Sequence, residues 1–102
     1  MSEFIKLCTV HELQPGQCKG INIKGEDVGL FNIDGEFCAM ENTCPHQGAP
    51  LTQGPVKDGV VMCPWHMWRF NVKTGKSLTA PGADMKTYEI KIEGEDVLIK
   101  WD

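Results

Sequence analysis

The stretch VGLFNIDGEFCAM, residues 28–40, decides the fold class, because it encodes two short strands joined by a tight turn. An Asp-Gly dipeptide, here Asp34-Gly35, is a strong β-hairpin signal when apolar residues flank it on both sides. The stretch contains no proline that would interrupt strand pairing. The sequence therefore predicts an antiparallel hairpin in which residues 28–33 pair with residues 36–40.

Further short strands are expected around this hairpin. Tyr88, Ile90 and Ile92 alternate with charged residues, and the alternation resumes at 97–101 after a Gly-Glu-Asp turn, which predicts a second hairpin. Long helical periodicity is absent, and 11 glycines and 6 prolines are spread along the chain. The prediction is an all-β fold, a small antiparallel β-sandwich or barrel. Its other expected elements are strands at 4–7, 21–23, 60–62 and 68–71 and a helical turn at 10–13.

Length and charge exclude several classes of protein. A chain of 102 residues indicates a single domain, residues 1–102. The formal net charge of −4 and the lack of a basic run disfavour nucleic-acid binding. No segment approaches the roughly 18 apolar residues of a membrane span. No basic stretch followed by an apolar run begins the chain, so we expect a cytoplasmic protein.

Residues 43–71 differ in character from the rest and are expected to form a metal-binding lobe inserted into a basal β-domain of residues 1–42 and 72–102. Apart from its aromatic residues the lobe is interpreted as having few apolar side chains, so its order is expected to depend on the bound metal. A Pro-Gly turn at Pro81-Gly82 is expected to close over the metal. The five cysteines, an odd number, exclude a fully paired disulfide framework and favour metal binding.

Two motifs carry the candidate ligands: CPHQG at 44–48 and CPWHMW at 63–68. They supply the pairs Cys44 with His46 and Cys63 with His66. Thiolate and imidazole together select zinc, iron or copper. Structural zinc usually pairs cysteine with cysteine and histidine with histidine, whereas each pair here is mixed. Mixed pairs suit a binuclear centre in which both cysteines bind one metal and both histidines the other.

CPHQGAPL (44–51) followed by CPWHMWRFNVKTGK (63–76) resembles the soluble Rieske ferredoxins that serve bacterial ring-hydroxylating dioxygenases, and the resemblance covers essentially the whole chain. It implies the Rieske fold and one Rieske 2Fe–2S cluster. Cys44 and Cys63 would hold the inner iron, and His46 and His66 the outer, solvent-facing iron. It further implies a monomeric electron carrier, not an enzyme by itself, between a flavin-dependent ferredoxin reductase and a terminal oxygenase.

The same resemblance distinguishes subgroups. Rieske proteins of cytochrome bc complexes carry an extra cysteine in each loop, and here Gln47 to Ala49 and Trp65 stand at the candidate positions. The chain therefore resembles the low-potential soluble group. It departs from that group at Met67, where glycine is more usual. Two alternatives stay open: a small Rieske subunit of a larger oxidoreductase such as nitrite reductase, and a zinc-binding interaction module.

The remaining candidates have simpler interpretations. Cys8, Cys18 and Cys38 lie in or beside expected strands and are interpreted as small buried side chains. His11, the only histidine outside the two motifs, is expected at the surface. Trp65 and Met67 flank His66 and either shield the cluster or form an apolar docking rim. The sequence shows no glycine-rich nucleotide motif, and His11 alone cannot supply the two histidines of an oxygen-activating iron site.

Overall fold

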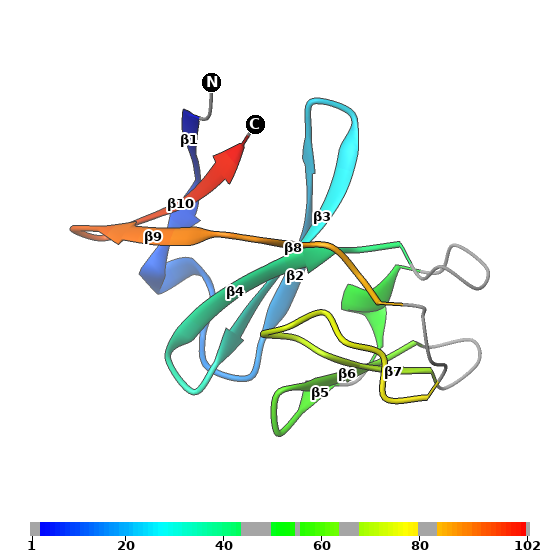
Figure 1. Ribbon diagram of the computed structural model, residues 1–102. Coiled ribbons are helices and arrows are strands. Elements are labelled where there is room, and N and C mark those ends of the chain that lie inside the picture. The colour runs from blue at the N-terminus through cyan, green and yellow to red at the C-terminus, as the bar shows by residue number, and fades with distance from the viewer. Residues whose placement is uncertain (1–2, 44–49, 55, 64–67, 80–83, 102) are drawn as a thin grey trace.

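The computed structural model describes residues 3–43, 50–54, 56–63, 68–79 and 84–101. In these residues the chain forms three antiparallel sheets, in the strand orders β1-β10-β9, β2-β3-β4-β8 and β5-β6-β7 (Figure 1). This confirms the all-β prediction. No helix of the described part is long and apolar enough to cross a bilayer. The elements are β1 Glu3–Thr9, 3₁₀ turn η1 Val10–Glu12, β2 Cys18–Ile23, β3 Glu26–Ile33, β4 Glu36–Glu41, 3₁₀ turn η2 Leu51–Gln53, β5 Val56–Lys57, β6 Val60–Met62, β7 Arg69–Asn71, β8 Thr87–Tyr88, β9 Ile90–Glu93 and β10 Asp96–Trp101.

The predicted hairpin at 28–40 is confirmed as β3 and β4. Ile33 pairs with Glu36, which leaves Asp34 and Gly35 as a two-residue turn. Their φ angles are 52° and 95°, and positive φ at both central residues is the pattern of a type I′ turn. The side chain of Asn32 stabilises this turn, since its Oδ1 accepts a hydrogen bond of 2.8 Å from the Gly35 N–H.

The second predicted hairpin is confirmed for β9 and β10, but the strand expected from Tyr88 to Ile92 is divided. Tyr88 in β8 pairs with Ala39 of the central sheet, whereas Ile90 in β9 pairs with Ile99 of β10. The chain thus passes from one sheet to another within two residues. Alternation of side chains assigns faces and carries no information about the neighbouring strand, which explains why the sequence did not reveal this change.

The middle strands of the central sheet, β3 and β4, are buried on both faces. Val28 and Leu30 pack with residues of the β1-β10-β9 sheet, and Phe31 and Met40 pack with residues of the lobe. In Figure 1 the β1-β10-β9 sheet lies to the upper left and β5-β6-β7 to the lower right. Burial on both faces explains why residues 28–31 are all fully or nearly fully buried, since a strand covered on both sides has no polar face.

The segment expected to be poor in apolar residues contributes strongly to this second core. Leu51, Val61 and Phe70 are fully buried and share one cluster with Phe31 and Met40. The expectation that this segment adds little apolar packing was therefore wrong. A few aliphatic side chains are enough to form a core when they pack against an apolar sheet. The chain beyond 71 also continues to pair with β7, through a bond of 2.8 Å from the Leu78 N–H to the Arg69 carbonyl.

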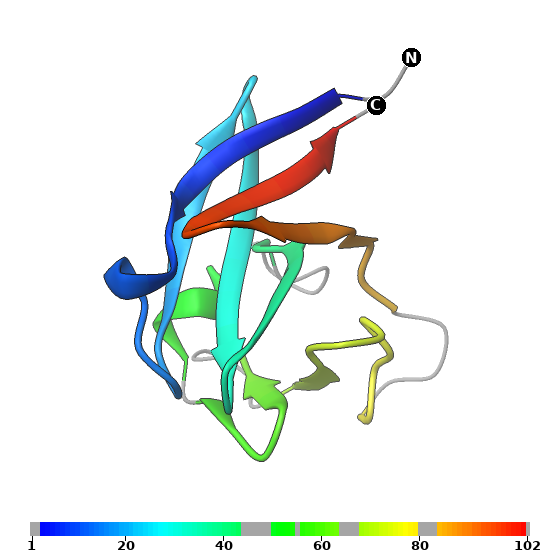
Figure 2. The same cartoon turned by 90° about the vertical axis from the view of Figure 1, so that its left-hand side faces the viewer.

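The two ends of the described chain lie side by side. Glu3 of β1 pairs with Trp101 of β10, and Figure 2 shows the start of β1 next to the end of β10. Both ends therefore belong to the sheet that lies on the opposite side of the central sheet from residues 51–71.

Candidate metal centre

Of the four predicted ligands, only Cys63 lies in the described part of the chain; Cys44, His46 and His66 lie outside it. Cys63 follows the last residue of β6, and it is 1% exposed. Its thiol is free and packs in the lobe-side core beside residues such as Phe70. An unpaired thiol in a dry environment is well suited to hold a metal that must be kept from water.

The segment that carries His66 starts from a closed hairpin base. The Cys63 N–H donates to the Trp68 carbonyl at 2.7 Å, and Met62 pairs with Arg69 one step further from the tip. These contacts join β6 to β7, and β6 pairs in turn with β5. A three-stranded sheet therefore fixes the two ends of residues 64–67.

The segment that carries Cys44 and His46 is closed at its base as well. The Leu51 N–H donates to the Asn42 carbonyl at 2.7 Å, and Thr43 forms an isolated antiparallel bridge with Pro50. The 3₁₀ turn η2 follows directly and contacts β6. The bases of the two predicted ligand segments are therefore neighbours in the fold.

A third segment starts from the same region. The Arg69 N–H donates to Thr79 Oγ1 at 3.0 Å, and the Ser77 N–H donates to Asp84 Oδ1 at 2.9 Å. In Figure 1 the described ends that flank residues 44–49, 64–67 and 80–83 all lie toward the right of the molecule. The predicted turn at Pro81-Gly82 and the flanking residues Trp65 and Met67 lie outside the described residues.

The candidate ligands do not include the other three cysteines or His11. Cys8 and Cys38 are buried as predicted, while Cys18 is half-buried and donates to the Thr52 carbonyl at 3.3 Å. Burial raises the pKa of all three thiols. His11 is exposed, as predicted, with its Nε2 3.2 Å from Glu95 Oε1. Within the described ranges no group of three or more potential ligand side chains gathers in one place.

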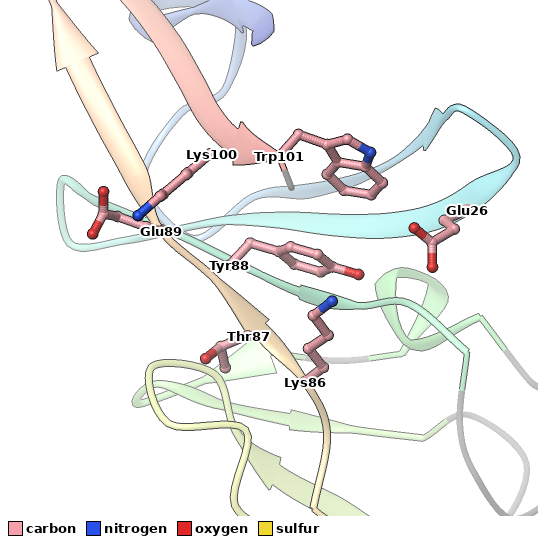
Figure 3. Close-up of a pocket in the computed structure, with 7 residues that line it drawn as sticks. All are labelled: Glu26, Lys86, Thr87, Tyr88, Glu89, Lys100 and Trp101. Carbon is pink, nitrogen blue, oxygen red and sulfur yellow. The ribbon is translucent and has the colours of Figure 1, made fainter. Parts of the chain in front are cut away.

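A small pocket between β8 and β10 is not a metal site. It holds the stacked rings of Tyr88 and Trp101, 5.3 Å apart, with the Lys86 ammonium 5.1 Å from the Tyr88 ring centroid (Figure 3). Such stacking and cation–π contacts are ordinary sources of packing energy. No thiol or imidazole lines the pocket, whose residues are Glu26, Lys86, Thr87, Tyr88, Glu89, Lys100 and Trp101.

Residues 3–99 match the family described as Rieske [2Fe-2S] domain. The chain belongs to the Rieske family. It accordingly carries one Rieske 2Fe–2S cluster, and its role is electron transfer rather than catalysis of a reaction by itself. Two thiols and two imidazoles are the donor set of such a cluster, in which histidines replace cysteines on one iron. The residues of this chain fit that group, because the buried free thiol of Cys63 lies at the base of the segment that carries His66.

Relatives and solved structures agree with this assignment. The chain is 42% identical over 98 residues to the biphenyl dioxygenase ferredoxin subunit of Pseudomonas sp. (strain KKS102), covering 94% of this chain and 90% of that one. It is similar, with a TM-score of 0.88 and 28% identity, to a chain in the complex of reduced oxygenase and oxidized ferredoxin in carbazole 1,9a-dioxygenase, covering 94% and 91% of the two chains.

The fold is also shared with a nitrite reductase relative. A putative NADH-dependent nitrite reductase small subunit from Mycobacterium tuberculosis has a TM-score of 0.91 at 24% identity, covering 100% of this chain and 97% of that one. At this identity the likeness concerns the fold alone.

Proposed function

We propose that this Rieske protein is the ferredoxin component of a ring-hydroxylating dioxygenase system. It accepts one electron from a flavin-dependent ferredoxin reductase and delivers it to a terminal oxygenase. The observation that carries this proposal is the 42% identity, across nearly the whole of both chains, to a ferredoxin subunit of a biphenyl dioxygenase. A solved ferredoxin complex with an oxygenase, similar to this chain in fold, supports the second partner.

We propose that Cys44 and Cys63 bind one iron and that His46 and His66 bind the other, within a cluster-binding lobe of residues 43–71. The neighbouring bases of the two ligand segments support this assignment, since η2 contacts β6. The burial of Cys63 supports its place on the inner iron. The two imidazoles would then lie on the partner side of the cluster.

The chain's own residues tune and shelter this centre. The cluster supplies a one-electron redox couple, and neutral imidazoles in place of two thiolates raise its reduction potential. The core around Cys63, which includes Phe70 and Leu51, keeps water from the thiolate. No bond needs to be made or broken in a substrate, so the protein's task is to hold the cluster close to a partner surface without large rearrangement.

A small subunit of nitrite reductase is the second candidate, and the fold likeness alone favours it. We propose instead a monomer that meets its partners transiently. We also place it in the cytoplasm, because the thiols of Cys8, Cys18 and Cys38 are unpaired, as expected in a reducing compartment. Gel filtration should give a monomer, whereas stable co-elution with a nitrite reductase would favour the second candidate.

The test uses the reductase and terminal oxygenase of the Pseudomonas sp. KKS102 biphenyl dioxygenase system as partners. With NADH and the reductase, the visible bands of the cluster should bleach, and they should return when oxygenase, biphenyl and oxygen are added. A matched assay without the ferredoxin sets the background. Cluster bleaching that never reverses on addition of oxygenase, together with electron delivery to a nitrite reductase, would contradict the proposal.

A further inference from the structure

The turn that follows the first ligand segment rests on two glycines of the central sheet. Gly20 of β2 pairs directly with Gly29 of β3, on the face that Phe31 shows to be covered by the lobe. A Cβ at Gly20 would lie 2.8 Å from Nδ2 of Asn42, and a Cβ at Gly29 would lie 3.0 Å from Cγ2 of Thr52. The absence of side chains at both positions therefore leaves the room that Asn42 and Thr52 occupy.

Asn42 joins both ends of the first ligand segment to this sheet. Its side-chain Oδ1 accepts from the Thr52 N–H at 2.8 Å, and its backbone carbonyl accepts from the Leu51 N–H at 2.7 Å. On the other side, its Nδ2 donates to Asp27 Oδ2 at 3.0 Å, and its N–H donates to the Asp27 carbonyl at 3.1 Å. The Cys18 thiol donates to the Thr52 carbonyl at 3.3 Å and adds a further contact.

Asn42 itself is only 2% exposed, so water cannot replace these bonds. The two ligand segments are supported in different ways. The second starts from a ladder of paired strands, β6 with β7. The first lies between the end of β4 and the 3₁₀ turn η2, with an isolated bridge of Thr43 and Pro50 at its base instead of a ladder.

We propose that Asn42 is the positioning residue for the first ligand segment, with Gly20 leaving room for its amide, Gly29 leaving room for Thr52, and Asp27 orienting the amide. Asn42 ties Leu51 and Thr52, which follow this segment, to the central sheet and so controls how firmly the cluster is retained and how its ligands are arranged. This inference rests on the proposed assignment of Cys44 and His46 as ligands. Asn42 lies outside the CPHQG motif in the sequence and is not one of the four proposed ligands.

The test variant is Asn42→Asp in the cluster-loaded protein. The carboxylate keeps an acceptor for the Thr52 N–H but loses the donor to Asp27 and faces the Asp27 carboxylate at hydrogen-bond distance. Breaking this buried hydrogen bond and placing two carboxylates side by side should weaken the anchoring of the first ligand segment. We expect cluster loss to a ferrous chelator to accelerate by about tenfold or more, with a changed electron paramagnetic resonance (EPR) line shape in the reduced state.

The rescue variant combines Asn42→Asp with Asp27→Asn. It restores one donor and one acceptor between the two side chains, with the direction of the hydrogen bond reversed. Chelator resistance and the EPR line shape should therefore return toward those of the unchanged protein. Recovery of both readouts would assign the effect to the Asn42–Asp27 hydrogen bond, and a pair that does not recover would contradict the role given to Asp27.

The matched control is Asn32→Asp. Asn32 is also buried, at 3% exposed, and it also uses its amide, donating to the Leu13 carbonyl and accepting from the Gly35 N–H at 2.8 Å each. It lies beside the β3–β4 turn, and within the described part of the chain its amide bonds to Leu13 and Gly35 rather than to the flanks of a ligand segment. This variant should lower the unfolding temperature while leaving the EPR line shape and the chelator rate unchanged.

Gly20→Ala gives a second, milder test should Asn42→Asp fail to fold. The added methyl group would push against the Asn42 amide, and faster cluster loss is expected without unfolding of the sheet. Equal chelator rates and line shapes for Asn42→Asp, Gly20→Ala and Asn32→Asp would overturn the inference. An unchanged protein without iron would instead contradict the proposed cluster assignment, so the two failures are distinguishable.

Discussion

Two histidines of this chain allow a direct comparison at the level of single residues. His66 follows the buried thiol of Cys63 by three positions, whereas the side chain of His11 is 71% exposed and its Nε2 lies 3.2 Å from Glu95 Oε1. We expect His66→Ala to remove a ligand of the outer iron and cause loss of the cluster's visible absorption. His11→Ala should leave the spectrum unchanged. Bleaching by His11→Ala alone would show that the ligand assignment is wrong.

The buried thiols give a second prediction for single residues. Burial raises the pKa of Cys8, Cys18 and Cys38, so they remain thiols at neutral pH, and the thiolate is the reactive form. Iodoacetamide should therefore label the folded protein slowly near pH 7 and label all five cysteines once it is unfolded. Mass spectrometry measures both, and rapid labelling of Cys38 in the folded protein would contradict the prediction.

The same pKa shifts have a consequence for stability. A group whose pKa is raised in the folded state stabilises that state below the unfolded pKa, about 8.5 for cysteine, and the contribution is lost as the pH rises above it. The unfolding temperature should thus change little near neutral pH and fall in alkaline buffer. A rise above about pH 9 would contradict this sign.

Cys63 and Asn42 show which residues a sequence can reveal. Cys63 was predicted as a ligand because its partner His66 is three residues away and the pair repeats the chemistry of Cys44 and His46. Asn42 carries no such signal, since Asp27 and Thr52 reach it only through the fold. The nearest hint, Gly20 and Gly29 on neighbouring strands, acquires meaning only once their register is known.

At the level of elements, local sequence signals predicted where strands lie better than they predicted which strands pair. The turn at Asp34-Gly35 was fixed by residues that favour positive φ. The division of the predicted strand between Tyr88 and Ile90 depends on which strand each residue meets, and β8 and β9 join different sheets. The two-residue strand β5 was likewise too short to leave a pattern.

The shared core leads to a prediction for the protein without its cluster. Because Val61 and Phe70 pack against Phe31, the strands β6 and β7 should stay protected from hydrogen exchange in the apo protein. Protection should fall mainly at the base of the first ligand segment, at the amides of Leu51 and Thr52. Complete exchange of β6 and β7 would show that the cluster is needed to fold the whole lobe.

At the level of the whole molecule, the central sheet separates two cores, one under β1, β9 and β10 and one under the lobe. Glu3 and Trp101, at the ends of the described chain, belong to the β1-β10-β9 sheet, on the other side of the central sheet from β6 and β7 (Figure 1). We therefore expect substitutions near these ends, such as at Glu3, to leave the metal centre unaltered.

The reduction potential is a property of the assembled centre. Hydrogen bonds to the cluster sulfurs raise the reduction potential. The Thr52 hydroxyl is one of the nearest hydroxyls along the chain, but its side chain packs against Gly20 and Gly29 of the sheet. Without a hydroxyl directly after His66 and without a loop-linking cysteine pair in the sequence, we expect a potential near the bottom of the Rieske range, about −150 mV. Protein-film voltammetry measures this potential. A positive value would group the protein with the Rieske proteins of cytochrome bc complexes.

Pulsed EPR of the reduced protein, combined with iron and sulfide analysis of the same sample, tests the ligand assignment most directly. The assignment of Cys44 and Cys63 to one iron and His46 and His66 to the other predicts two irons and two acid-labile sulfides per chain, with two distinct imidazole nitrogens coupled to the cluster spin. Substitution of His66 by alanine should abolish this signal. A single bound zinc, or an iron–sulfur cluster with no nitrogen coupling, would contradict the account.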